Sequence, residues 1–406
     1  MQDLQPISIN PAVTAVNKRL ARSFDRLVRG YDRARGTLHL GGRKATYDDH
    51  KYEFHGGAGE RLRRRHYDKS LRLLWKAEHN APWSSFQDCS KQERAFIESA
   101  KQKAPWSTSN ERSKQEQALH DLASESLGTQ ERAEVQRIRS KEYADFLDAT
   151  YTPEQKQALV NILSMIGHGE AYAWLISTEL LNQVKSTGGR SAMTMQVLEE
   201  AKHFVVLREL IMAFDCDVPP MCGWEYLLME RAYKAQGLEK FFGMNVLVES
   251  FALSLFGALS HLPGLEILRL FHLDESRHMA LPKSYFQDFP MSWWQTHNPA
   301  NQLRRLSLVI PALPILTWIE ADLAVLGIDV FEFGGSMTRK TLTMAEQAGF
   351  RMGLPAKTLQ TVFDSAFNLY CDWTRPDHIN QDFMRSETTQ DSAARAVEQA
   401  VLEAIA

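Results

Sequence analysis

The sequence predicts an all-α protein. Across its 406 residues, apolar side chains recur at helical spacing in most stretches after about residue 90. Breaks rich in Gly and Pro separate these stretches, among them Gly188-Gly189, Pro219-Pro220 and Pro263-Gly264. No run of residues makes a convincing strand. A chain of this length can bury a sizeable helical core.

Residues 1–150 are expected to form a basic N-terminal extension with peripheral helices. Residues 1–80 carry 17 Lys and Arg against 9 Asp and Glu, although the whole chain has a net charge of −3. Residues 36–59 are rich in Gly and typical of a loop or short strands. The dense basic run 61–66 predicts a solvated face or a subunit contact, with an acidic partner as the alternative. The small overall charge predicts no nucleic-acid partner. Three stretches of this extension have a helical pattern: 17–29, 90–103 and 110–149.

Residues 151–285 are expected to form the helical core. Thr152 and Pro153 predict a helix start, with Thr at the N-cap and Pro at the first helical position. That helix is expected to continue to about Val184 and to break at residues 185–189. Four further helical patterns follow, at residues 191–214, 224–235, 238–260 and 265–280.

Residues 286–406 are expected to add C-terminal helices that pack on this core. The most apolar stretch, 306–327, contains Pro311, Pro314 and two acidic residues. It therefore predicts a buried helix pair or a kinked helix rather than a membrane span. Two helical patterns and a polar tail, expected to be a terminal helix, complete the chain: 341–348, 357–373 and 386–406.

The cysteine content predicts a reducing compartment. The four cysteines are Cys89, Cys216, Cys222 and Cys371, and no two of them have the C-x-x-C spacing. So few cysteines are unlike a disulfide scaffold. The N-terminal residues also lack the basic and apolar regions of a signal peptide. We therefore expect a cytoplasmic protein.

Two five-residue stretches of the core have nearly the same pattern. One is Glu199-Glu200-Ala201-Lys202-His203 and the other is Asp274-Glu275-Ser276-Arg277-His278. On a helix, residues three apart lie on one face, so Glu200 lies beside His203 and Glu275 beside His278. Two such faces turned toward each other supply half of a dinuclear metal site.

Two further glutamates stand at matching distances upstream. Glu170 lies 30 residues before Glu200, and Glu249 lies 26 residues before Glu275, with a helix break in each interval. In an antiparallel hairpin around residues 261–264, Glu249 and Glu275 reach the same height, about 17 Å from the turn. Glu179 is the alternative to Glu170 but fits less well around its turn. The two hairpins together supply four carboxylates and two imidazoles.

This ligand set suits a pair of first-row metal ions, because carboxylates can bridge two ions and one His for each ion leaves positions open. Iron is the first expectation and a manganese–iron pair the second, whereas a lone zinc ion would take fewer carboxylates. The arrangement resembles the ferritin-like di-iron carboxylate proteins over about residues 161–281. That resemblance implies a ferritin-like four-helix bundle with additional N- and C-terminal helices. It implies six metal ligands, which would also be the catalytic residues: Glu170, Glu200, His203, Glu249, Glu275 and His278.

The stretch from Asp274 to Met279 looks especially similar to the bacterial multicomponent monooxygenase hydroxylases. A similar stretch occurs in the fatty-acyl desaturases and in the p-aminobenzoate N-oxygenases. Leu207 stands where the radical-bearing ribonucleotide reductase subunit has Tyr, which argues against radical storage. Phe271 stands where the N-oxygenases have a third His, and His272 lies one position away. Leu253 stands where the monooxygenases often have Thr.

Several residues near the predicted ligands are expected to support them. A carboxylate that binds the second ring nitrogen of a ligand His orients that ring. This role, with a solvated helix face as the alternative, is expected for Glu199, Lys202, Asp274 and Arg277. His168 and His272 are expected to be ordinary core or surface histidines. Core packing is expected for Tyr172, Trp174 and Phe271, with the lining of a pocket as the alternative.

The resemblance implies an O₂-activating di-iron oxygenase or oxidase that hydroxylates or otherwise oxidises a small organic substrate. The sequence contains no flavin or nucleotide motif, so a reductase or a ferredoxin is expected as the external electron donor. The enzymatic alternatives are an amine N-oxygenase and a desaturase-like oxidase. The non-enzymatic alternative is a ferroxidase or metal-binding protein. A homodimer is left open.

Overall fold

The computed structural model describes residues 7–37, 137–138, 140–184, 187–375 and 377–384. Within these ranges the chain is helical and has no strand, with one isolated bridge between Met352 and Leu354. The all-α prediction is therefore confirmed for the described residues. Apart from Arg137, these residues belong to one compact unit made of residues 1–51 and 138–406. The predictions for residues 38–136 and for the tail from 386 lie outside the described residues.

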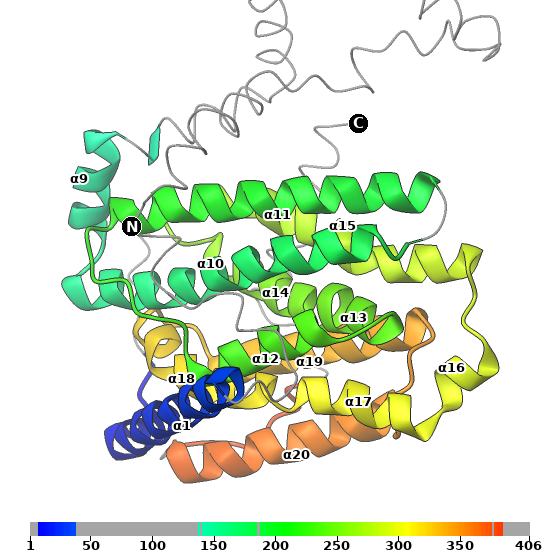
Figure 1. The fold of residues 1–406 in the computed structure, drawn as a ribbon. Coiled ribbons are helices and arrows are strands. Elements are labelled where there is room, and N and C mark those ends of the chain that lie inside the picture. Colours follow the sequence, from blue (N-terminus) through cyan, green and yellow to red (C-terminus); the bar gives the residue numbers. More distant parts are fainter. Residues whose placement is uncertain (1–6, 38–136, 139, 185–186, 376, 385–406) are drawn as a thin grey trace, which may run out of the picture. The chain divides into compact units, whose positions relative to one another are not determined.

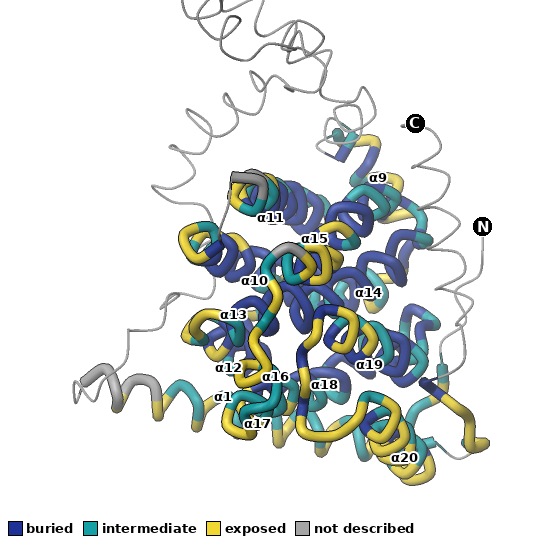
Figure 2. Tube along the Cα trace, turned by 90° about the vertical axis from the view of Figure 1, so that its right-hand side faces the viewer, coloured by how far each residue is buried: buried dark blue, intermediate teal, exposed yellow. Residues whose placement is uncertain are grey.

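Two helix pairs, drawn in the upper half of Figure 1, carry the predicted ligands. The first pair is α10 (Pro153–Leu181) and α11 (Thr187–Ala213). The second pair is α14 (Glu249–Leu259), which continues the π-helix η3 (Gly243–Val248), and α15 (Leu268–Asp288). Helix α11 contacts α15, and α10 contacts η3, so the two pairs pack on each other. Helix α14 is buried along most of its length (Figure 2).

The remaining helices pack on these two pairs or on one another. Helices α12 and α18 pack against α10. Helix α19 packs against α14 and also contacts α20. Helix α1, from the N-terminal region, packs on α12 and α18. The helices outside the two pairs are α1 (Pro11–Thr37), α9 (Lys141–Thr150), α12 (Gly223–Lys234), α13 (Leu238–Phe242), α16 (Trp293–His297), α17 (Pro299–Val309), α18 (Ala312–Val325), α19 (Val330–Gln347) and α20 (Ala356–Thr374).

Helix α10 begins where its local sequence predicts. The Thr152 side chain accepts a hydrogen bond from the backbone N–H of Gln155, and the Gln155 side chain accepts one from the backbone N–H of Thr152. This capping box satisfies two backbone donors that the first helical turn would leave unpaired. The predicted break at residues 185–189 is wrong in part, because α11 already starts at Thr187. Glycines are tolerated in that first turn, which lacks a complete set of intrahelical hydrogen bonds.

The segment before Glu249 differs from the regular helix predicted for residues 238–260. Residues 243–248 form a π-helix between α13 and α14. The backbone N–H of Glu249 donates to the carbonyl of Met244, five residues earlier. A π-helix holds more residues in each turn than an α-helix and is rare, so periodicity does not reveal it.

Helix α19 begins at Val330, earlier than the helix predicted from residue 341. Its interior contains Gly335, where a Cβ atom would lie 2.2 Å from the carbonyl oxygen of Phe383. Glycine therefore allows the chain after α20 to pack directly against α19.

Two helical stretches in the described residues are long and apolar enough to cross a membrane, Leu238–Leu259 and Pro299–Val325. In the first, 94% of the apolar window is buried inside the protein, and in the second 50%. The second stretch comprises α17 and α18, so a helix pair, one of the two predicted alternatives, is observed there, with half of its apolar window buried. Buried core helices have the same length and composition, so these stretches are weak evidence for a membrane span.

Candidate metal centre

The six residues predicted as metal ligands come together in the structure, and all six are buried. Their ligand atoms form two groups, and within each group these atoms lie within 4.8 Å of one another. The two groups are Glu170, Glu200, His203 and Glu275, and Glu200, Glu249, Glu275 and His278. Glu200 and Glu275 belong to both groups. Each group therefore has one carboxylate and one imidazole of its own and shares two carboxylates with the other.

Helix geometry explains how each stretch delivers two of these side chains. Glu200 and His203 lie on α11, and Glu275 and His278 lie on α15, each pair one helical turn apart. The facing helices α10 and α14 each add one carboxylate, Glu170 and Glu249.

The His203 ring bridges helices α10, α11 and α15. Its Nδ1 atom points toward the ligand carboxylates and lies 3.3 Å from Glu170 Oε2 and 2.9 Å from Glu275 Oε1. Its Nε2 atom faces away and donates to Asp274 Oδ2 at 3.0 Å. With the Nε2 proton held by Asp274, Nδ1 has its lone pair available for a cation. Phe271 stacks on the ring at 4.2 Å between centroids.

The His278 ring has the same arrangement in the other group. Its Nδ1 atom lies 3.1 Å from Glu275 Oε2 and 3.3 Å from Glu200 Oε1. Its Nε2 atom donates to Glu199 Oε2 at 2.8 Å. Each helix therefore supplies the carboxylate that orients the histidine of the other helix. The expectation that Glu199 and Asp274 lie beside the ligand histidines agrees with this geometry.

Two cations hold these supporting carboxylates in their charged form. Arg277 donates to both Glu199 and Asp274, and Lys202 lies 3.1 Å from Asp274 Oδ2. Burial raises the pKa of Asp274, but Lys202, His203 and Arg277 outweigh burial and lower the net pKa. Burial also raises the pKa of Glu199. The hydrogen bond from His278 and the positive charge of Arg277 outweigh burial, so the net pKa of Glu199 is lowered.

Two amide side chains beside the ligands were not predicted from the sequence. Gln196 donates to Glu249 Oε1 at 2.7 Å and to Glu200 Oε1 at 3.2 Å. Asn245 donates to the Gln196 side-chain oxygen at 2.7 Å and to the backbone carbonyl of His278 at 3.1 Å. Each amide lies four residues before a ligand glutamate, so a search for polar residues one turn upstream would have found both.

The electrostatics of the cluster favour cations at its centre. Burial and the Glu275 carboxylate raise the pKa of Glu170 well above its ordinary value. Burial, together with the Glu200 and Glu275 carboxylates, does the same to Glu249. Glu200 Oε2 is buried and accepts no hydrogen bond. Such a buried acceptor is costly unless a cation or a donor meets it.

The charges also fit a pair of divalent ions. The four ligand carboxylates, when ionised, carry four negative charges, which two divalent cations neutralise. The Glu199 and Asp274 carboxylates are balanced separately by Arg277 and Lys202. The donor set therefore fits two divalent cations that share Glu200 and Glu275.

Glu179, the alternative ligand named from the sequence, and the nearby residues His168, His272 and Tyr172 lie outside both groups. Glu179 pairs with the buried Lys240. His272 is buried and its Nδ1 lies 3.0 Å from the Leu253 carbonyl. His168 is buried, and its Nδ1 lies 3.9 Å from Glu225 Oε1. The buried Tyr172 donates to Glu230 at 2.9 Å.

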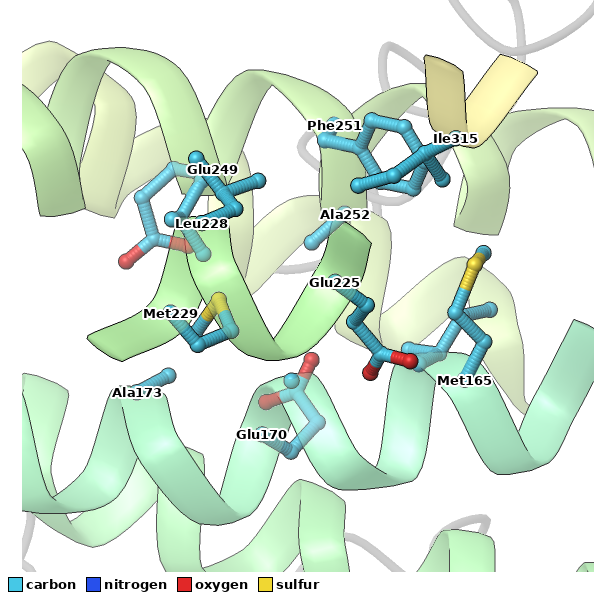
Figure 3. Close-up of a pocket in the computed structure, with 13 residues that line it drawn as sticks. Met165, Glu170, Ala173, Glu225, Leu228, Met229, Glu249, Phe251, Ala252 and Ile315 are labelled. Carbon is cyan, nitrogen blue, oxygen red and sulfur yellow. The ribbon is translucent and has the colours of Figure 1, made fainter. Parts of the chain in front are cut away.

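A cavity adjoins the cluster (Figure 3). Side chains of α10, α12, α18 and the η3–α14 segment line it, and they are mostly apolar. Its volume is about 40 Å³. The ligand residues Glu170 and Glu249 form part of its wall, and the third acidic residue in the wall is Glu225. A small molecule in the cavity would therefore lie next to the ligand cluster.

Comparisons with models of protein families, with curated proteins and with solved structures give no match to this chain.

Proposed function

We propose that the four helical segments around the cluster form a ferritin-like bundle that holds two metal ions. The observation that carries the proposal is the overlap of the two ligand groups at Glu200 and Glu275. Two carboxylates shared between two sites are what a bridged pair of ions requires. The hydrogen bonds from His203 to Asp274 and from His278 to Glu199 support the proposal, because they orient each ring with Nδ1 toward the shared carboxylates.

Iron is the metal that the donor set supports best, with a manganese–iron pair as the alternative. Four carboxylates and two imidazoles are hard to intermediate ligands, and no thiolate takes part. Such ligands favour iron and manganese over zinc, which prefers more His or Cys. A ferrous pair, when bound, supplies O₂ activation at neutral pH.

The function that follows is the O₂-dependent oxidation of a small organic molecule. The cavity would bind this molecule beside Glu170 and Glu249, and its apolar walls would exclude water from the reacting groups. Asp274 and Glu199 would keep the ligand imidazoles in one tautomer during turnover. Electrons would come from a separate reductase or ferredoxin.

The experiment that tests this function follows O₂ consumption by the iron-loaded, reduced protein in the presence of candidate small organic substrates. We expect consumption that is stimulated by a substrate and accompanied by an oxygenated or dehydrogenated product. Glu275→Ala should abolish the stimulation, and Glu230→Ala, at a buried acid outside both groups, should retain it. Uptake of iron beyond two ions for each chain, with no substrate-dependent turnover, would instead indicate a ferroxidase.

A further inference from the structure

Glu225 is a buried acidic residue in the wall of the cavity that belongs to neither ligand group. It lies on α12, whereas the two ligand residues in the wall lie on α10 and α14. Its side chain is shown among the cavity residues in Figure 3. Only 5% of the residue is exposed, and its Oε1 atom accepts no hydrogen bond.

No hydrogen bond from the described residues stabilises Glu225 Oε1 in its buried position. The His168 ring lies beside it, with Nδ1 3.9 Å from Oε1, beyond hydrogen-bond distance. The backbone N–H of Glu225 donates to the Cys222 sulfur at 3.4 Å at the start of the helix, and a hydrogen bond from the Cys222 backbone to the carboxyl group lowers the pKa of Glu225, partly offsetting burial. Its neighbours in the cavity wall on α12 are Leu228 and Met229.

A carboxyl group in such a place is unfavourable for folding. Removing an unpaired polar atom from water lowers the stability of the fold by roughly 1–3 times the amount that one hydrogen bond adds to it. Burial also raises the pKa of Glu225 well above its ordinary value. A carboxyl group in its neutral form both donates and accepts hydrogen bonds. A small polar group that enters the cavity can therefore satisfy it.

We propose that Glu225 is a specificity-determining residue that binds the one polar group of a small, mainly hydrocarbon substrate. A hydroxyl group is the partner that fits best, because it can accept from the carboxyl group and donate to it. The substrate class is thus a small alcohol or phenol rather than a bare hydrocarbon. The role in a reaction rests on the proposed oxidation, whereas the binding of the hydroxyl does not.

The position of Glu225 decides how such a molecule lies. The Glu225 side chain points from α12 toward α10, on the side where Glu170 lies (Figure 3). A hydroxyl group bound to it therefore lies in the part of the cavity that Glu170 also lines, and the hydrocarbon part fills the remaining apolar space. Glu225 thus selects the substrate and holds it beside the ligand cluster.

The test measures the binding of two probe pairs in which a hydroxyl replaces a methyl group: phenol with toluene, and 1-butanol with pentane. The full chain, loaded with ferrous iron under nitrogen so that no turnover occurs, is titrated by calorimetry or ligand-observed NMR. Glu225→Met removes the carboxyl group at similar length. Glu225→Gln keeps a hydrogen-bonding group. Glu230→Gln changes a buried acid of the same helix that does not line the cavity.

We expect the ratio of phenol affinity to toluene affinity to fall roughly tenfold or more in Glu225→Met. The ratio should change less than threefold in Glu225→Gln and in Glu230→Gln. An unchanged ratio in Glu225→Met, or the failure of both hydroxyl probes to bind to the wild-type protein, would overturn the proposal.

A second measurement guards against loss of folding in the Met variant. In a crystal structure of the wild-type chain with phenol, the hydroxyl oxygen is expected within about 3 Å of a Glu225 oxygen. A phenol bound elsewhere, or turned away from Glu225, contradicts the proposal. Metal analysis of the same samples separates the two ideas: if iron does not bind, the oxidation function fails while the probe ratios still test Glu225.

Discussion

Glu199 on α11 accepts a 2.8 Å hydrogen bond from Nε2 of His278 on α15. The reciprocal contact, from His203 on α11 to Asp274 on α15, measures 3.0 Å. Each acid directly precedes a ligand glutamate of its own helix, so the same helical turn supplies one ligand and the carboxylate that orients the histidine of the other helix. This exchange ties α11 and α15 together at the cluster and fixes both imidazole tautomers.

Substitution of these supporting acids should weaken the binding of metal without removing it. Glu199→Gln and Asp274→Asn keep the shape of the side chain but lose the charge that holds the Nε2 proton. Changes of this kind typically lower metal affinity about 10–100-fold. Competition with a chelator of known affinity measures the effect. An affinity within twofold of the wild-type value in both variants would contradict the role assigned to the two acids.

The shared carboxylates should differ from the others in their effect on metal content. Glu200→Ala removes a ligand from both groups, so both ions should be lost. Glu170→Ala and Glu249→Ala each affect one group, and one ion should remain bound for each chain. Elemental analysis after gel filtration measures the content, with Glu230→Ala as the control outside both groups. Equal losses in all three ligand variants would show that the two sites are not arranged as described.

Metal affinity should rise with pH. Burial and neighbouring carboxylates raise the pKa of Glu170 and Glu249. Burial lowers the pKa of His203, but hydrogen bonds with Asp274, Glu170 and Glu275 outweigh it and raise the net value. Groups with raised pKa values keep their protons to higher pH, and a cation must displace these protons to bind. Affinity should therefore increase about tenfold in each pH unit for each proton displaced, until the groups are deprotonated.

Calorimetric titrations with manganese(II) between about pH 6 and pH 8 measure this dependence. Buffers with different ionisation enthalpies give the number of protons released. An affinity that stays constant over this range would mean that the ligands are already deprotonated. In that case the raised pKa values do not describe the protein in solution.

Filling the cavity from α10 should block small molecules but not metal. A Cβ atom at Gly169 would meet no atom within 4 Å, and this residue lies in the cavity wall. Gly169→Leu should therefore weaken toluene binding at least tenfold and leave the metal content at the wild-type level. Gly30→Leu is the matched control, because Gly30 on α1 has equally open surroundings away from the cavity. Unchanged toluene binding in Gly169→Leu would place the binding site elsewhere.

The close contact between α19 and the chain after α20 should tolerate no side chain at Gly335. A Cβ atom there would lie 2.2 Å from a backbone oxygen of Phe383, which cannot move as a flexible side chain can. Gly335→Ala should destabilise the protein by about 2 kcal/mol. At the neighbouring Gly334 the obstacle is the tip of Leu316, so Gly334→Ala should have a smaller effect. Thermal unfolding compares the two, and equal midpoints would contradict the packing described.

Local patterns in the sequence predict the parts of the structure that depend on residues close in the chain. The start of α10 follows from the Thr152–Gln155 capping box, and the pairing of Glu200 with His203 follows from helical spacing. The matched intervals around the hairpin turns also place Glu170 and Glu249 at the cluster, and Glu179 outside it.

Features that depend on tertiary packing were not predicted. The π-helix before Glu249 carries no periodic signal that separates it from an α-helix. Gln196 and Asn245 are polar residues on helices, and only the assembly of the two helix pairs brings them together. Glu225 follows a Pro-rich break in the sequence, and nothing in the local pattern indicates that it is buried beside a cavity.

The most direct test of the central claim is a titration of the metal-free chain with ferrous iron under nitrogen, followed by Mössbauer and EPR spectroscopy. The shared carboxylates Glu200 and Glu275 predict that binding saturates at two ions for each chain and that the two ions are magnetically coupled. Saturation at a single ion, or two ions that show no coupling, would contradict a centre in which two metals share these carboxylates.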